Sequence, residues 1–131
     1  MNRQLKFRVW DKLAERMIYP HNDNQQHFII DLNGRFHNLQ NGSGGDDYVI
    51  QQYTGLTDSN DDPIYEGDIL KNHYDVGNNI IGQVLYESDH GGYIFQWKRK
   101  GRGQDYKNLN CDVAFESVIV GNKFEHSELL N

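Results

Sequence analysis

Apolar and polar residues alternate with a period of two along much of the chain, a pattern that predicts short β-strands. The first such run, Leu5–Trp10, places Leu5, Phe7 and Val9 on one face and predicts a half-buried strand, with Met17–Tyr19 as its short partner. The 3.6-residue period of an amphipathic helix is not sustained over any long stretch, so little helix is expected. The pattern therefore predicts a mainly β protein.

A hairpin is predicted between residues 27 and 39, where His27–Leu32 and Arg35–Leu39 flank the pair Asn33-Gly34. Asn-Gly adopts the positive φ values of a two-residue type I′ turn, which this hairpin is expected to contain. His27 and His37 would then face each other loosely across the strands. An exposed cross-strand pair is the simpler interpretation of these histidines, and a zinc-binding pair is the alternative.

Glycine-rich turns separate the remaining runs. Segment 41–47 is a flexible connector, and later strands are expected at 48–53, 69–74, 80–87, 93–98 and 118–120. Structural turns are expected at Gly55 and at Gly67-Asp68, and Gly82 indicates a bulge or a close backbone approach. Ser127 is the expected cap of a single helical turn that ends at Leu130.

Short strands joined by glycine turns favour a small β-barrel or sandwich. By analogy, a Gly-Asp turn, a strand, then a glycine-containing strand and a hairpin is the order of an SH3-like β-barrel, which is the fold expected here, with an N-terminal hairpin added. Residues 1–131 are long enough for one core and are expected to form one domain. A soft internal boundary in the loop 41–47 separates an N-terminal hairpin region, 1–47, from a barrel core, 48–131.

A net charge of −6 argues against a protein whose whole surface binds nucleic acid or anionic lipid. Cys111 is the only cysteine, so no internal disulfide can form and no cysteine cluster can hold zinc. The first residues carry charge where a signal peptide would be apolar, and no run is long enough for a spanning helix. A cytoplasmic protein is expected.

Several sequence blocks, in order along nearly the whole chain, resemble the YopX family. They are Lys6–Asp11, Met17–Tyr19, Gln52–Leu56, Ile64–Ile69, Val118–Asn122 and Glu128–Leu130. The resemblance implies a small bacteriophage or prophage protein with an SH3-like β-barrel core, which self-associates and has no established biochemical activity. His126-Ser127 stands where the family tends to have Asn-Pro, a departure that concerns the geometry of the tail.

The turn around Gly67, residues 58–68, is acidic. It holds five carboxylates and no basic residue among them: Asp58, Asp61, Asp62, Glu66 and Asp68. Its start is similar to a calcium loop, but Pro63 stands where that loop needs Gly, and Ile69 stands where it needs Glu. A solvated turn with Asx hydrogen bonds is favoured over a metal site. Capping or pairing roles are likewise favoured for Glu66 and Asp68 over acid–base chemistry.

A basic loop follows the aromatic residues Tyr93, Phe95 and Trp97, which share one strand face. Aromatic rings beside cations are how single-stranded nucleic acid is often bound, so a nucleic-acid site is hypothesised at Trp97, Lys98, Arg99, Lys100 and Arg102. The favoured interpretation is that the aromatics form the core face of a barrel strand and the cations an exposed loop.

No nucleophile, base and orienting group come together at a legible spacing, and Cys111 has no neighbouring base to activate it. The sequence therefore predicts no catalytic residue, cofactor or metal. We expect a non-enzymatic binding or self-assembling module: a homo-oligomer, or an adaptor for a host or phage protein, that binds no membrane. Nucleic-acid binding through residues 98–102 is the alternative.

Overall fold

The computed structural model describes residues 4–19, 27–75, 78–99, 101 and 103–131. Strand accounts for 55% of the structure and helix for 11%, so the chain is mainly β, as its alternating pattern predicts. It divides into two compact units, Met1–Gln52 and Tyr53–Asn131. The expectation of one domain with a soft boundary at 41–47 stays a prediction.

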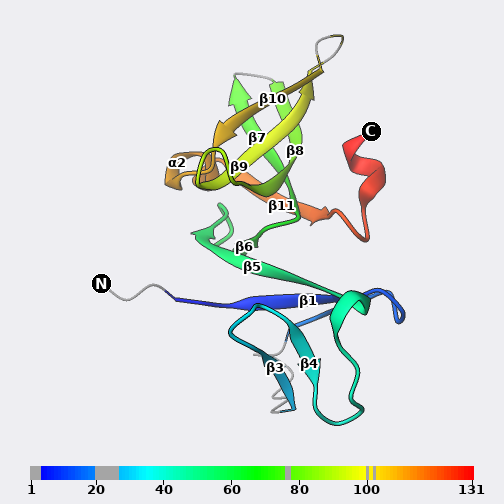
Figure 1. Cartoon of the computed structure of the whole chain (residues 1–131). Coiled ribbons are helices and arrows are strands. Elements are labelled where there is room, and N and C mark those ends of the chain that lie inside the picture. Colours follow the sequence, from blue (N-terminus) through cyan, green and yellow to red (C-terminus); the bar gives the residue numbers. More distant parts are fainter. Residues whose placement is uncertain (1–3, 20–26, 76–77, 100, 102) are drawn as a thin grey trace. The chain divides into compact units, whose positions relative to one another are not determined.

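The first unit contains four short strands, a 3-10 helix and the start of a long strand (Figure 1). They are β1 (Phe7–Asp11), β2 (Arg16–Ile18), β3 (Phe28–Ile30), β4 (Phe36–Asn38), η1 (Gly45–Asp47) and β5 (Tyr48–Thr57). The chain passes into the second unit within β5, which pairs with β1 through its first half and with β6 through its second.

The second unit holds most of the strands and one short α-helix. They are β6 (Pro63–Tyr65), β7 (Asp68–Asp75), β8 (Asn78–Glu87), β9 (Gly92–Arg99), β10 (Gly103–Asn108), α2 (Cys111–Phe115), β11 (Ser117–Asn122) and η2 (Ser127–Leu130). Five of the strands form an antiparallel sheet in the order β10-β9-β8-β7-β11, which curls into a half-barrel (Figure 1). No helix of the described residues has the length and apolar character needed to cross a membrane.

Strand β1 is buried on both faces, so the prediction of a half-buried strand is wrong. Val9 is fully buried, as expected, but Arg8 and Trp10 on the opposite face are also buried. The Arg8 Nε donates a hydrogen bond of 2.8 Å to Oε1 of Gln51, which lies directly opposite it on β5. A polar partner at the paired position thus makes burial of the guanidinium tolerable.

The hairpin at residues 27–39 is confirmed, with β3 paired to β4, but its type I′ turn is not. Asn33 is absent from the residues with positive φ, whereas Gly34 has φ of 79°. The Gly34 N–H donates to the Asp31 carbonyl, and the Asp31 N–H donates to the Arg35 carbonyl. This is a three-residue loop of a type I turn followed by a left-handed glycine.

The core of the second unit lies on one face of the curled sheet. It contains Ile64, Leu70, Val84, Phe95, Trp97, Val113 and Ala114. Gly82 lies on β8 where a Cβ atom would meet the carbonyl oxygen of Gln96 and the ring of Phe95. The expected close backbone approach at Gly82 is therefore confirmed. The missing side chain lets the backbone of β8 lie close to that of its neighbour β9.

Two turn-forming residues, Gly67 and Asp68, lie at the start of β7. Gly67 has φ of 86°, in the region that favours glycine, and its N–H donates to the Val84 carbonyl. Asp68 is buried, and its Oδ2 accepts a hydrogen bond of 2.8 Å from the Tyr65 N–H. Gly55, within β5, has φ of 90°.

A short helix, α2, occupies residues 111–115. Asn110 caps it, because its Oδ1 accepts from the Val113 N–H at 2.9 Å. The terminal helical turn at Ser127–Leu130 is confirmed as the 3-10 helix η2. Its cap position is His126, which makes no side-chain capping bond, so the assignment of Ser127 as the cap is wrong.

Candidate binding sites

The aromatic residues of β9 face the core. Phe95 and Trp97 are 1% and 8% exposed, their ring centroids lie 5.4 Å apart, and Tyr93 packs against the same cluster. Base stacking needs exposed rings, so this burial supports the favoured interpretation, in which the stripe forms the core face of the strand. Trp97 is a core residue.

The two described cations after Trp97, Lys98 and Arg99, do not share one face of the strand. Lys98 and Arg99 are both exposed, but successive residues of a strand point to opposite faces. The Arg99 Nη1 forms an ion pair of 3.3 Å with Oδ2 of Asp105 on the adjacent strand. Lys100 and Arg102 lie outside the described residues.

On the face of the sheet opposite the core, polar side chains line a groove of about 540 Å³, which we call the amide groove. Strands β8, β9 and β10 form its floor, and the C-terminal turn η2 forms a wall. Its lining residues are Asn79, Ile81, Gln83, Gln96, Lys98, Gln104, Ser127, Leu129, Leu130 and Asn131.

The strand register brings the polar groups of the amide groove together. Gln83 lies directly opposite Gln96 on the neighbouring strand, and Gln104 lies directly opposite Lys98. Directly opposed residues have Cβ atoms roughly 4.5–5.5 Å apart. The groove therefore holds two pairs of opposed polar side chains, Gln83 with Gln96 and Gln104 with Lys98.

The wall of the amide groove is held in place by the turn after β11. Asn122 is buried, and its Oδ1 accepts hydrogen bonds from the N–H groups of Phe124 and Glu125 at 3.0 and 2.9 Å. Its own N–H donates to Nδ1 of His126 at 3.2 Å. The ring of His126 packs so closely on Gly121 that a Cβ atom there would collide with it.

A second concave surface, in the first unit, is apolar. We call this space of about 310 Å³ the apolar groove; it is lined by Leu5, Lys6, Phe7, Val9, Phe28, Ile29, Ile30 and Phe36. Leu5 and Ile29 are 60% and 41% exposed. Such an exposed apolar surface is typical of an interaction site.

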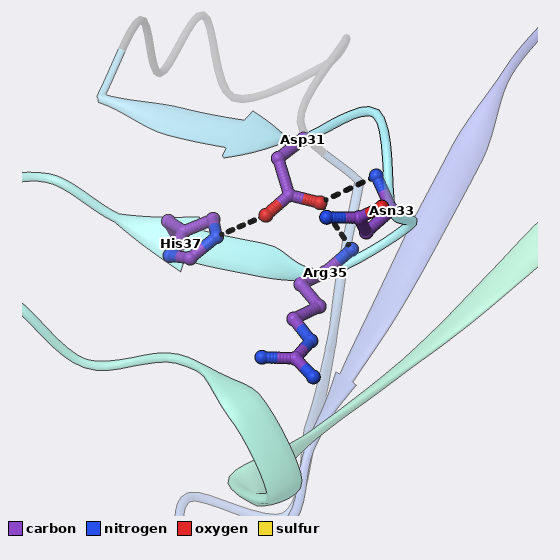
Figure 2. A network of polar contacts seen from close by, with 4 residues as sticks. All are labelled: Asp31, Asn33, Arg35 and His37. Atoms are coloured by element: carbon purple, nitrogen blue, oxygen red, sulfur yellow. Dashed lines mark hydrogen bonds and ion pairs between the residues drawn. The ribbon is translucent and has the colours of Figure 1, made fainter.

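A polar network supports the hairpin that borders the apolar groove (Figure 2). Asp31 accepts hydrogen bonds from the backbone N–H groups of Asn33 and Arg35 and lies 2.9 Å from Nε2 of His37. The hydrogen bond from His37, followed by that from the Arg35 backbone, lowers the pKa of Asp31 below its usual value of 3.8. The network fixes the hairpin loop.

The register of the hairpin does not place the two predicted histidines opposite each other. His37 pairs with Ile29, and the carbonyl of His27 accepts from the Leu39 N–H. His37 is bound to Asp31, whereas the His27 ring lies 4.4 Å from that of Phe28. These positions argue against a zinc-binding pair of His27 and His37 across the hairpin.

Two carboxylates of the described acidic turn are buried, Asp68 and Asp58. Asp58 binds its own loop. Its Oδ1 accepts from the N–H groups of Asn60 and Asp62, and its Oδ2 accepts from the Ile119 N–H. The carboxylate therefore stabilises the loop by Asx hydrogen bonding. Within the described part of the chain, no three His, Cys, Asp or Glu residues are grouped so that they could hold a metal ion.

Sequence reasoning missed the glutamines of the amide groove. Gln96 and Lys98 alternate with Phe95 and Trp97, so the period of two does place them on the face opposite the core. The positions of Gln83 and Gln104 beside them follow only from the register between strands. The wall depends on the return of the tail, which no local pattern indicates.

Together, these features define a mainly β protein with concave surfaces suited to binding. The model of the family described as YopX protein matches residues 6–131, and the chain belongs to the YopX family. No curated protein sequence matches it. The crystal structure of protein EF1440 from Enterococcus faecalis is similar in fold, with a TM-score of 0.58 and 23% sequence identity over 99% of this chain and 100% of that one.

Proposed function

We propose that the chain is a non-enzymatic accessory protein of a bacteriophage or prophage, which works in the host cytoplasm by binding and self-associates through its first unit. Membership of the YopX family supports the phage origin. Three buried charged side chains make structural hydrogen bonds, which supports binding rather than catalysis. Arg8 binds Gln51, and Asp58 and Asp68 accept backbone hydrogen bonds.

The observation that carries the proposal is the surface around β3. In the described residues, this strand pairs with β4 alone, in a sheet of two strands. Its residues, Phe28, Ile29 and Ile30, are all apolar and also line the apolar groove. An isolated hairpin of two strands is marginally stable, and an apolar strand edge tends to gain a further strand.

A second copy of this chain fits that edge. When β3 pairs antiparallel with itself about Ile29, Phe28 lies opposite Ile30 of the partner copy, so apolar side chains meet apolar side chains. The strand carries no charge that such a pairing would bury. The contact uses the same patch on both copies, as a two-fold symmetric dimer requires.

Light scattering during gel filtration tests the self-association. At micromolar concentration we expect a dimer for the parent protein and a monomer for Ile29→Lys, because a lysine there introduces charge at the centre of the contact. Leu13→Lys is the control: Leu13 is more exposed, at 80%, but lies in the turn between β1 and β2. A strictly monomeric parent, or equal effects of the two substitutions, contradicts the proposal.

For the second unit, we infer an SH3-like barrel. Strands β7 to β10 follow one another in a meander, and β11 returns to pair with β7 after the short helix α2. This connectivity, with the last strand beside the first, supports the relationship to SH3-like barrels. Such a fold hosts many unrelated functions and does not by itself supply one.

Nucleic-acid binding is the second candidate function. The observation that favours it is Lys98, which is exposed next to Arg99 at the end of β9. If the basic loop 98–102 binds nucleic acid, Arg99→Glu weakens binding of a single-stranded DNA and reduces its salt dependence. An unchanged affinity in this variant removes the loop as the binding element.

A further inference from the structure

The amide groove has the dimensions of a site for a small polar ligand. Its volume of about 540 Å³ lies within the range of roughly 300–1,000 Å³ that is usual for ligand pockets. Strands β8, β9 and β10 provide a rigid floor, and the tail at Ser127–Leu130 encloses one side. A ligand can therefore lie on the sheet while it contacts a wall.

Three side-chain amides in the groove are available to such a ligand. Among the described residues, none makes a hydrogen bond with the side chains of Gln83, Gln96 or Gln104. A glutamine side chain offers two N–H donors and a carbonyl acceptor, which together match the edge of a nucleobase. Since Gln83 and Gln96 lie directly opposite each other, both amides can contact one planar ligand.

The charge of the groove favours an anionic ligand. The chain has nineteen acidic residues and a net charge of −6, yet no side chain among the described lining residues is acidic. Lys98 is exposed and forms no ion pair with the described residues. An ammonium group without a carboxylate partner is a suitable contact for a phosphate.

An exposed aromatic ring lies beside the groove on the same face of the sheet. Tyr106 is directly opposite Gln96 on β10 and is 48% exposed, with its ring centroid 4.9 Å from that of His90. Unlike Trp97, it presents a ring on which a base can stack. The groove and Tyr106 together supply contacts for a base edge, a base face and a phosphate.

We propose that the amide groove binds a nucleotide unit, either free or within a single-stranded nucleic acid. Gln83 and Gln96 contact the edge of the base, Lys98 contacts the phosphate, and Tyr106 stacks on a neighbouring base when the ligand is a strand. The site is independent of the proposed self-association, since the groove and β3 belong to different units. It also differs from the basic-loop hypothesis, because it requires the glutamines rather than Arg99.

Two probes test the site in the full-length chain: a fluorescein-labelled oligothymidylate, followed by fluorescence anisotropy, and thymidine monophosphate, followed by calorimetry. We expect binding of at least one probe, and we expect Lys98→Glu to weaken it about tenfold or more, because one charge-assisted contact is lost. Gln96→Ala and Gln83→Ala are expected to weaken it by a smaller factor. Saturation by the free nucleotide identifies a nucleotide site, whereas affinity that rises with strand length identifies a single-strand site.

Lys12→Glu is the matched control, because it makes the same change in net charge at an exposed turn of the first unit. Equal losses in Lys12→Glu and Lys98→Glu would indicate unspecific electrostatic attraction and would overturn the proposal. So would a failure of both probes to bind the parent chain. A loss in Arg99→Glu with unchanged affinity in both glutamine variants would place binding in the basic loop and exclude the groove.

Discussion

The carboxylate of Asp58 accepts a hydrogen bond of 3.0 Å from the backbone N–H of Ile119, which lies 61 positions further along the chain. The same side chain accepts from the N–H groups of Asn60 and Asp62. Asp58 is 3% exposed, so the carboxylate that accepts the three bonds is buried. One buried carboxylate thus closes the loop before β6 and attaches it to β11.

Replacement of Asp58 by alanine is expected to destabilise the chain by roughly 2–4 kcal/mol, because it removes a buried acceptor that three backbone N–H groups share. Asp62→Ala is the control: Asp62 is exposed, and its bond to Asp58 is made by the backbone. Its effect is expected to remain within about 0.5 kcal/mol. Urea unfolding of both variants measures the difference, and similar midpoints for the two would show that the bridge to Ile119 contributes little.

Gly82→Ala is expected to cost about 1–3 kcal/mol or more, because the added methyl group would collide with the carbonyl of Gln96 and the ring of Phe95. Gly92→Ala provides a comparison within the same strand pair, since no atom lies within 4 Å of a Cβ at that position. Thermal unfolding should show a lower midpoint for the Gly82 variant alone. A Gly82 variant as stable as the parent would mean that β8 and β9 can separate without loss.

The period of two was sufficient to predict the strands but not their burial. In β1 it correctly identified Val9 as a core residue, yet it assigned Arg8 to an exposed face. The burial of Arg8 depends on Gln51, which is 43 positions away and is brought opposite it by the register. Likewise, the side chain of Asp31 decides the loop conformation of the hairpin in place of the Asn-Gly pair. Both outcomes depend on polar partners that local propensity does not contain.

Asp31 is expected to make the stability of the first unit dependent on acid pH. The hydrogen bond from His37, with that from the Arg35 backbone, lowers the pKa of Asp31 below 3.8, so the ionised form favours the folded chain (Figure 2). This contribution is fully present above 3.8 and is lost as the pH falls through the lower folded value. It is small, because the Asp31 and His37 side chains are 34% and 43% exposed.

Chemical unfolding over a series of pH values, with the parent and Asp31→Asn, measures this contribution. The stability difference between the two is expected to shrink as the pH falls below 3.8. Asp89→Asn, in the exposed turn between β8 and β9, controls for the loss of one charge. A difference that persists at strongly acid pH would mean that the contribution of Asp31 to stability does not depend on its ionisation.

The candidate site was less accessible to sequence reasoning than the fold. Lys98 was identified because cations cluster after Trp97, but Trp97, the aromatic residue grouped with it, lies on the opposite face of the strand and is buried. Gln83 and Gln104 come from other strands and become neighbours only through register. A site made of neutral amides leaves no composition signal, since glutamine is also an ordinary residue of exposed strands.

The conformation of the tail offers a last prediction, because one buried side chain, Asn122, accepts two hydrogen bonds in the turn before it. Asn122→Ala removes the acceptor for the Phe124 and Glu125 N–H groups and is expected to release residues 127–130 from the sheet. Asn122→Asp keeps that acceptor but sets a carboxylate against that of Glu125 in place of the Nδ2 bond, so it should release the tail less than the alanine variant does. Hydrogen exchange of the backbone amides at 127–130 measures the release.

Faster exchange in Asn122→Ala than in Asn122→Asp is therefore the expected result, with the exchange of β8 and β9 unchanged in both variants. Ser127, Leu129 and Leu130 form the wall of the amide groove. The alanine variant should therefore also bind a nucleotide ligand more weakly than the aspartate variant does. Equal protection of the tail in the two variants would show that His126, packed on Gly121, holds the wall without help from Asn122.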